Sequence, residues 1–325
     1  MRQRRYRVVT TAIGLTSNED TLVDDPKYFR DVTWECLRND YYEFLPLPDD
    51  TPLDGELLIY DCDRPALEVV VQDDLAVIAG PIRALERQAK DRRFALLGTQ
   101  GYLYRFILYV LERRKSIYSF HSNALYDEAS NTLVISMGGA GAGKTPVLLS
   151  GIERGWKVFS TELTHVAIEG GQCVFYKGGM YDNVRVGNLS EDFPAVHAQL
   201  GVPLPRTSDV WATKFCVDLS AAEAKPDRLV SPNVRIVFPR IEAGWDRPIL
   251  SPITTRVSLQ KALYDNASEK VGTSFLLYES VPVSGFDSPG LARNRFEAMG
   301  RLLETMRLER AETLLSSPRG CRELF

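Results

Sequence analysis

A lysine and a threonine close a glycine-rich stretch that runs from residue 138 to residue 145 and reads GGAGAGKT. A chain of phosphates must be wrapped by backbone N–H groups, and glycine lets the backbone approach closely and adopt positive φ. Lys144 supplies a mobile positive charge for the outer phosphates, and the Thr145 hydroxyl can ligate Mg²⁺. The stretch fits the G-x-x-x-x-G-K-[ST] pattern, which predicts a P-loop that binds ATP and Mg²⁺ as cofactors.

Two elements must position this loop. The apolar run at residues 132–137 predicts a strand that enters it, and the apolar spacing at 147–152 predicts a helix that leaves it. The start of such a helix points unpaired N–H groups and the positive end of its dipole at the phosphates, and it tolerates a proline. A glycine-rich turn that carries GKT by coincidence is the alternative. The predicted cofactor-binding residues are Gly138, Gly139, Ala140, Gly141, Ala142, Gly143, Lys144, Thr145 and Pro146.

Composition narrows the class of protein. Of the 325 residues, 44% are hydrophobic and 25% charged, which is ordinary for a soluble globular chain. The formal net charge of −4 argues against general nucleic-acid binding, and no apolar run reaches the length of a membrane span. The five cysteines are scattered and include no C-x-x-C pair, which favours reduced thiols in the cytoplasm over zinc or a disulfide framework.

The chain divides into two parts by pattern. Residues 1–116 form a strand-rich N-terminal region with two helices, and residues 117–325 form the domain that contains the P-loop. In the first part we expect a loop at 45–55, strands at 6–13, 56–60, 67–72 and 75–79, and helices at 82–93 and 98–115. In the second part we expect strands at 117–126, 132–137, 155–161, 166–168, 172–176, 181–186, 214–218 and 234–238, and helices at 189–200, 258–266 and 290–308.

Two further side chains could take part in chemistry at the P-loop. His121 falls on the strand expected beside the P-loop strand, which supports a catalytic or substrate-orienting role and a structural one equally. Glu162 ends the strand expected after the P-loop helix, where ligands meet parallel-type sheets, so it is a candidate metal ligand or base rather than a surface carboxylate. We interpret the other two histidines, His165 and His197, as structural.

An anionic substrate or a transferred phosphate calls for a further cation. Lys177, Lys214 and Arg235 are possible, and our preferred residues are Arg185 and Arg240, each with a solvated surface position as its alternative. Asp182 could bind a polar substrate or cap a turn. The predicted substrate-binding residues are therefore Asp182, Arg185 and Arg240.

The order of these features resembles the P-loop kinases related to the C-terminal domain of HPr kinase/phosphorylase, which share a core with phosphoenolpyruvate carboxykinase. The shared order is a strand with His121, the P-loop, a helix that ends in Arg154-Gly155, and a strand followed by Thr161-Glu162. Val237-Phe238-Pro239-Arg240 and Leu250-Ser251-Pro252-Ile253 resemble later segments of the family. The resemblance covers roughly residues 96–308 and implies an α/β fold with a mixed sheet, a P-loop kinase core of the HPr kinase/PEP carboxykinase type.

The resemblance also assigns roles, with one departure. The family has Asp-Asp where this chain has Thr161-Glu162: one aspartate acts as base toward the acceptor hydroxyl, and the other helps to hold Mg²⁺. This implies Lys144, Glu162 and His121 as catalytic residues, and Thr145 and Glu162 as metal ligands. With one carboxylate missing, either His121 or water takes over a task or catalysis has been lost.

Three functions remain as expectations. The leading one is an ATP-dependent kinase that phosphorylates a hydroxyl of a small molecule; the others are a protein serine kinase and a nucleotide-binding regulatory module without turnover. The expected partners are a nucleotide and a small-molecule acceptor, with neither nucleic acid nor membrane. The resemblance leaves a homo-oligomer open.

Overall fold

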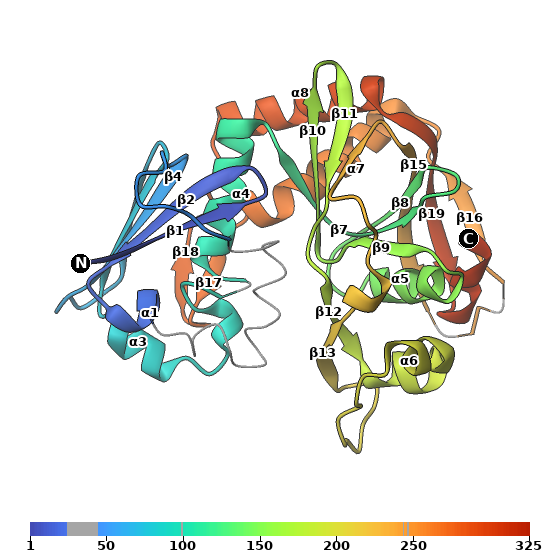
Figure 1. The fold of residues 1–325 in the computed structure, drawn as a ribbon, viewed down its shortest axis with the longest axis horizontal. Helices are drawn as coiled ribbons and strands as arrows, with labels where there is room; N and C mark the ends of the chain where they lie inside the picture. The colour runs from blue at the N-terminus through green and yellow to red at the C-terminus, as the bar shows by residue number, and fades with distance from the viewer. Residues whose placement is uncertain (25–44, 99, 243, 246) are drawn as a thin grey trace. The chain divides into compact units, whose positions relative to one another are not determined.

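The computed structural model describes residues 1–24, 45–98, 100–242, 244–245 and 247–325. The protein has a mixed α/β fold with parallel and antiparallel strand pairs, and it divides into two compact units (Figure 1). Unit 1 comprises Met1–Tyr118 and Ser268–Ala292, and unit 2 comprises Ser119–Ala267 and Arg293–Phe325. Our sequence boundary between residues 116 and 117 treats the two parts as consecutive, whereas each unit draws on two segments of chain.

Unit 1 contains a six-stranded sheet with the strand order β3-β1-β2-β4-β6-β5. Its strands are β1 (Arg2–Val8), β2 (Thr11–Ser17), β3 (Leu45–Pro46), β4 (Gly55–Asp61), β5 (Glu68–Gln72) and β6 (Leu75–Gly80). The helices are α1 (Asp20–Asp24), α3 (Ile82–Gln88), α4 (Tyr102–Lys115) and the 3₁₀ turn η1 (Arg92–Phe94), and a separate hairpin consists of β17 (Phe275–Leu277) and β18 (Val281–Val283).

Helix α4 forms the core of unit 1. All its residues from Tyr102 to Glu112 are buried. A Cβ added to Gly55 of β4 would lie 2.7 Å from Val110, so a glycine at this position lets the sheet approach the helix. The ring of Phe286 lies 5.0 Å from that of Tyr102, which explains why the second segment belongs to this unit.

Unit 2 is built on a nine-stranded sheet, with the order β14-β11-β10-β7-β8-β15-β19-β16 and with β9 paired to β7. Its strands are β7 (Tyr118–Asp127), β8 (Thr132–Met137), β9 (Lys157–Ser160), β10 (Leu163–Glu169), β11 (Gln172–Tyr176), β14 (Arg228–Val230), β15 (Asn233–Ile241), β16 (Ile249–Pro252) and β19 (Arg307–Ser316). Strands β12 (Tyr181–Arg185) and β13 (Lys214–Asp218) form a separate two-stranded sheet. The helices are α5 (Lys144–Glu153), α6 (Pro194–Leu200), α7 (Arg256–Val271) and α8 (Pro289–Thr305), with the π-helical turn η2 (Asn188–Asp192) and the 3₁₀ turns η3 (Ser220–Ala222) and η4 (Arg319–Leu324). The end of α7 from Ser268 and the start of α8 up to Ala292 belong to unit 1.

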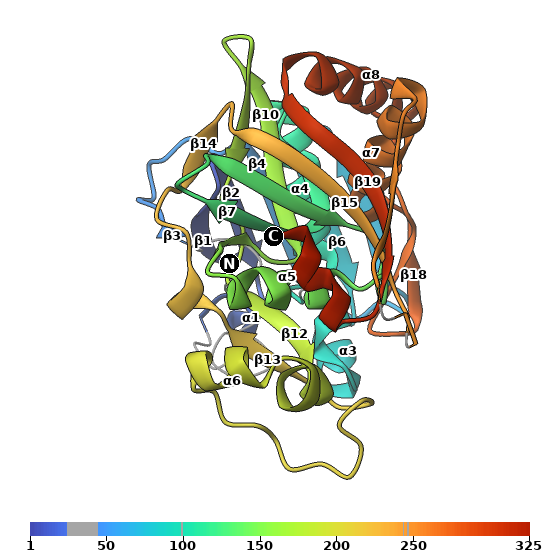
Figure 2. The same ribbon diagram turned by 90° about the vertical axis from the view of Figure 1, so that its right-hand side faces the viewer.

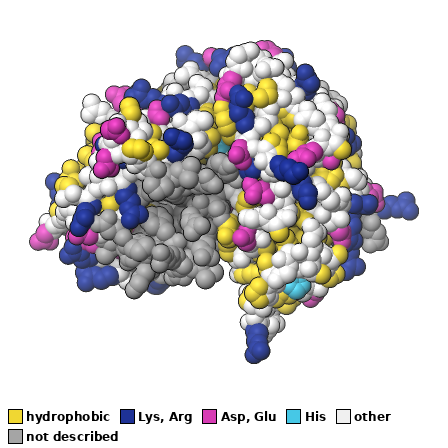
Figure 3. Space-filling view, viewed as in Figure 1, with side chains coloured by type: hydrophobic (Ala, Val, Ile, Leu, Met, Phe, Trp, Pro, Cys, Tyr) yellow, Lys and Arg dark blue, Asp and Glu magenta, His cyan; other side chains and the backbone are white. Residues whose placement is uncertain are grey.

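The strand that carries the glycine-rich loop lies inside the large sheet. β8 pairs antiparallel with β7 and parallel with β15. Val147 of α5 packs with Val134 of β8 and with Leu324 of η4, so α5 and η4 cover one face of the sheet. Figure 2 shows α7 and α8 along the other face. On the face of unit 2 that Figure 3 shows, side chains of both charge signs are interspersed with apolar ones.

Three sequence predictions need correction. The strand expected at residues 6–13 is a hairpin of β1 and β2, because Val9 turns the chain with a φ of 55°. The helix expected at 290–308 ends at Thr305, and the chain then enters β19, which pairs parallel with β15 inside the sheet. Cys62, Cys173 and Cys321 are free thiols as expected, whereas Cys216 is disulfide-bonded; Cys36 lies outside the described residues.

Within the part of the chain that the structure describes, no helix is long and apolar enough to cross a membrane.

Candidate functional site

The glycine-rich loop joins β8 to α5 and takes its shape from positive φ angles. Gly138, Gly141 and Gly143 have φ values of 155°, 83° and 103°. A Cβ at Gly143 would lie only 2.1 Å from Cγ1 of Ile241, so both the backbone angle and the space require glycine there. At Gly139 an added Cβ would meet no described atom within 4 Å, which leaves the outer side of the loop open.

Helix α5 begins at Lys144, directly after the loop. Its N-cap residue is Gly143, which has no side chain to cap the first turn, so the first N–H groups of the helix face the loop. Pro146 is buried in this first turn, where a missing N–H removes no helical hydrogen bond. The predicted cofactor-binding residues therefore form one loop and one helix start, the arrangement that binds phosphates in other proteins.

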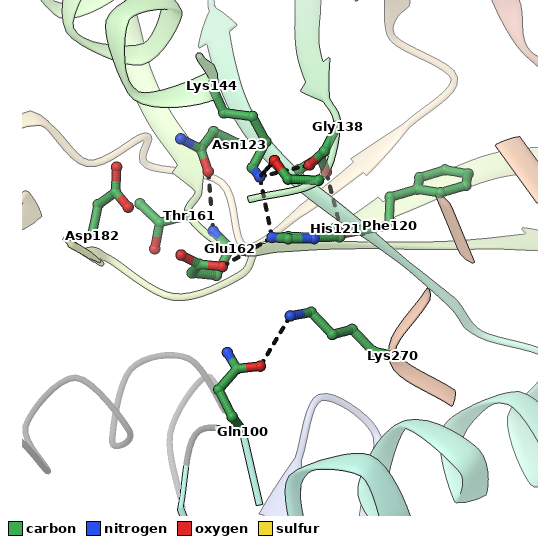
Figure 4. Close-up of polar contacts among 12 residues, drawn as sticks. Gln100, Phe120, His121, Asn123, Gly138, Lys144, Thr161, Glu162, Asp182 and Lys270 are labelled. Carbon is green, nitrogen blue, oxygen red and sulfur yellow. Dashed lines mark hydrogen bonds and ion pairs between the residues drawn. The ribbon is translucent and has the colours of Figure 1, made fainter. Parts of the chain in front are cut away.

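The Lys144 side chain folds back over the loop. Its ammonium donates a hydrogen bond to the carbonyl oxygen of Gly138 at 2.6 Å and lies 3.1 Å from Nε2 of His121 (Figure 4). His121 is on β7, the neighbour of β8, and is buried. Sequence reasoning placed His121 beside the strand that enters the glycine-rich loop, and the structure brings its ring to Lys144.

Glu162 completes this row of polar groups. One of its carboxylate oxygens lies 3.3 Å from Nε2 of His121. The residue has a φ of 55°, a left-handed conformation that is strained for any residue other than glycine. Two hydrogen bonds to β7 hold it there: its N–H donates to Oδ1 of Asn123, and its carbonyl oxygen accepts from the N–H of Ser122, both at 3.1 Å.

A second carboxylate contacts the start of helix α5 from another strand. Asp182 of β12 accepts a hydrogen bond of 3.0 Å from the Thr145 hydroxyl. Asp182 is buried, and the pKa of its carboxyl is raised to about 6. Burial is the main cause and the negative charge of nearby Glu162 adds to it, while the Thr145 hydrogen bond and the charge of Lys144 oppose the shift. Asp182 was predicted as a substrate residue, and its contact is with the predicted metal ligand Thr145.

Thr161, which stands where the resemblance implies an aspartate, has a structural contact. Its hydroxyl shares its single proton between the carbonyl oxygens of Gly179 at 3.0 Å and Tyr181 at 2.7 Å. The two bonds tie the end of β9 to the start of β12. They therefore help to set the position of Asp182, the next residue along β12.

Two predicted substrate residues have other neighbours. Arg185 lies on β12 but alternates with Asp182, so its side chain is on the opposite face, where it donates to the carbonyl oxygen of Trp211. Arg240 is 78% exposed and pairs with Glu242 at 2.6 Å. The solvated alternative fits both arginines.

The two remaining histidines also have structural partners. His165 is buried with Nδ1 2.7 Å from the Ser119 hydroxyl, and burial lowers the pKa of its ring to about 4. Nε2 of His197 lies 2.9 Å from the carbonyl oxygen of Val202.

The residue that sequence reasoning missed is Asn123. It follows His121 by two positions on a strand, and the period of two places both side chains on the same face. That spacing is the signal that could have identified it.

The side-chain oxygens of Thr145 and Asp182 suit a metal ion that a bound phosphate also coordinates. Among the described residues, no group of three or more His, Cys, Asp or Glu side chains could hold a metal by itself. Mg²⁺ commonly binds one or two carboxylates together with substrate phosphates and waters. The Thr145 hydroxyl beside the Asp182 carboxylate fits this requirement.

Comparisons with known proteins identify no family for this chain. No protein-family model matches the chain, and no curated protein matches it. Among solved structures, the HPr(Ser) kinase/phosphatase from Coxiella burnetii is similar over 55% of this chain and 92% of its own, with 12% sequence identity and a TM-score of 0.25. At this TM-score the similarity does not bear on the activity of the chain.

Proposed function

We propose that the protein is a Mg²⁺-dependent phosphotransferase that moves the γ-phosphate of ATP to a hydroxyl group of a small molecule. The observation that carries the proposal is the meeting of the P-loop with two acidic side chains. Thr145 contacts Asp182 from β12, and the charge of Glu162, which follows β9, is close enough to raise the pKa of Asp182. Phosphoryl transfer needs such positioned charges more than covalent help from the protein.

The residues divide into two groups in this proposal. Thr145 and Asp182 would hold Mg²⁺, whose charge would offset that of the phosphates, and Lys144 would bind the outer phosphate oxygens. Glu162 takes the proton of the acceptor hydroxyl as the hydroxyl oxygen bonds to phosphorus and the bond from phosphorus to ADP breaks, and His121 relays that proton from Glu162. Nε2 of His121 cannot accept from Lys144 and donate to Glu162 at once, so release of Lys144 frees this nitrogen to carry a proton.

The proposal includes a P-loop kinase core of the HPr kinase/PEP carboxykinase type, supported by the order of His121, the P-loop and Glu162 along the chain. A nucleotide-binding module without turnover is the main competing function, because Thr161 stands in place of an acidic residue. Asp182 supplies a second carboxylate from a different strand and so favours catalysis.

Substitution Glu162→Gln tests the catalytic claim. Removing a base typically slows a reaction by about 10²- to 10⁴-fold. We expect this loss in the turnover of ATP, with ATP affinity within about threefold of that of the unchanged protein. The control is Glu128→Gln in the exposed β7–β8 turn, which should leave turnover unchanged. Lys144→Ala should weaken ATP binding whether or not the protein turns over. Full turnover in Glu162→Gln would contradict the role of this residue.

A further inference from the structure

The Asn123 side chain is satisfied on one side only. Its Oδ1 accepts the N–H of Glu162 at 3.1 Å, and this contact fixes which end of the amide is the donor. Asn123 is 3% exposed, and no hydrogen-bond partner for its Nδ2 exists among the residues that the structure describes. A buried donor without a partner is unfavourable in the free protein, and native structures seldom retain one without a reason.

A second unsatisfied group lies beside it. Ser136 of β8 is directly opposite Asn123 in the register of β7 and β8, and its buried hydroxyl also has no partner among the described residues. Val134, two residues before Ser136, packs against Val147 of α5, so Ser136 is on the face of the sheet that α5 covers. Leu125, two residues after Asn123, packs with Leu148 of the same helix. Both unsatisfied groups therefore lie at the P-loop end of that face.

The position of the amide limits what it could bind. An N–H group donates to oxygen and does not ligate a metal ion, and the oxygen of a metal-bound water already directs a lone pair at the metal. Figure 4 shows the amide of Asn123 next to the side chain of Lys144, with its oxygen directed at the N–H of Glu162 and its nitrogen directed away from Glu162. Glu162 is the group that we place at the acceptor hydroxyl, so an anionic oxygen beside it belongs to the phosphoryl group being transferred.

We propose that Asn123 is a substrate-contacting residue whose Nδ2 donates to the γ-phosphate of the bound nucleotide while its Oδ1 holds Glu162 in the left-handed conformation. This inference rests on the proposed function. It predicts that Asn123 distinguishes ATP from ADP, because ADP lacks the group that the amide contacts. A hydrogen bond to a charged oxygen corresponds to an affinity change of about 10- to 100-fold.

The test compares the binding of ATP and ADP, each with Mg²⁺, by calorimetry. In Asn123→Ala we expect ATP affinity to fall about 10- to 100-fold and ADP affinity to stay within about threefold. At a pH at which its carboxyl is ionised, Asn123→Asp retains an acceptor for the Glu162 N–H but no donor, so it should lose ATP affinity at least as strongly. Equal losses for both nucleotides, or no loss for either, in the folded Asp variant would overturn the inference.

A matched control separates this effect from the loss of any unsatisfied buried group. Thr11 of β2 in unit 1 is fully buried, and its hydroxyl has no partner among the described residues. Thr11→Val should leave the ATP-to-ADP affinity ratio unchanged. The failures are distinguishable: an unchanged protein that binds neither nucleotide refutes the proposed function together with this inference, whereas normal binding with an unaltered ratio in the Asn123 variants refutes only the inference.

Discussion

At the scale of single residues, Asp182 is unusual for an acidic group because its carboxyl is buried. Its buried carboxyl has a pKa of about 6, whereas an aspartate in an unfolded chain titrates near 4. The folded state therefore binds this proton more tightly than the unfolded state does. The stability that the group contributes is fully present below about pH 4 and is lost as the pH rises through about 6.

Substitution Asp182→Asn should therefore stabilise the protein at neutral pH. Without Mg²⁺, we expect the free energy of unfolding at pH 7.5 to rise by roughly 1–3 kcal/mol, because an uncharged amide replaces a buried charge. The gain should shrink toward zero at pH 4. Urea unfolding at the two pH values measures it, with the exposed Asp63→Asn as control. A gain that does not depend on pH would contradict the assigned cause, and the same variant should lose Mg²⁺-dependent ATP turnover.

The sequence indicated some of these residues and not their contacts. The spacing of glycines, Lys144 and Thr145 is local, so the motif predicts the loop directly. The Thr145–Asp182 contact depends on where the separate β12–β13 sheet meets the start of helix α5, and no local pattern encodes that. Asn123 carries no motif, and its importance follows from a hydrogen bond to a residue far along the chain.

At the scale of elements, the loop between β8 and α5 depends on space as well as on backbone angle. Gly141 and Gly143 both have positive φ, but a Cβ at Gly143 would lie 2.1 Å from Cγ1 of Ile241, whereas one at Gly141 would meet no described atom within 4 Å. Alanine substitutions at these two positions therefore separate the effect of the backbone angle from the effect of limited space. Both alanine variants carry backbone strain, and only the variant at Gly143 adds a steric clash.

We expect Gly143→Ala to lower the free energy of unfolding by about 1–3 kcal/mol more than Gly141→Ala does, which is the usual cost of overpacking. Chemical denaturation measures the difference. Adding Ile241→Ala to Gly143→Ala should recover part of the loss because it removes the clashing side chain. Equal destabilisation by the two single variants would show that the contact with Ile241 is unimportant.

Strand and helix predictions succeeded where the pattern was local. The hairpins β5–β6, β7–β8 and β10–β11 have alternating or apolar strands with turn residues between them, and the strands of each form where we expected strands. The error at residues 290–308 arose because helix α8 passes into β19 without a proline or glycine to mark its end. Pairing with β15 makes this segment a strand, and that interaction is invisible in its own sequence.

At the scale of the whole molecule, each unit is assembled from two separate segments. Unit 1 needs Ser268–Ala292, because Arg105 of α4 donates to the carbonyl oxygen of Lys270 at 2.8 Å and Tyr278 donates to Glu86 at 2.7 Å. Phe286 adds ring contacts to α4. Composition and periodicity describe consecutive stretches of chain, so they could not have revealed that each unit includes a second, distant segment.

A fragment of residues 1–118 should therefore lack a cooperative unfolding transition, because part of its core is missing. Adding a separate peptide of residues 268–292 should restore the transition, measured by near-ultraviolet circular dichroism. The same peptide with Phe286→Ala should restore it poorly, since removing a buried phenylalanine typically costs about 3–5 kcal/mol. Cooperative unfolding of the fragment alone would show that the second segment is dispensable.

The central proposal is that this protein transfers a phosphate from ATP to a small molecule. The most direct measurement incubates the purified protein with ATP, Mg²⁺ and pooled hydroxylated metabolites, and uses mass spectrometry to find any compound that gains one phosphate. We predict one such product, formed together with an equal amount of ADP and absent with Glu162→Gln. Binding of ATP without a phosphorylated product from any pool would contradict the claim.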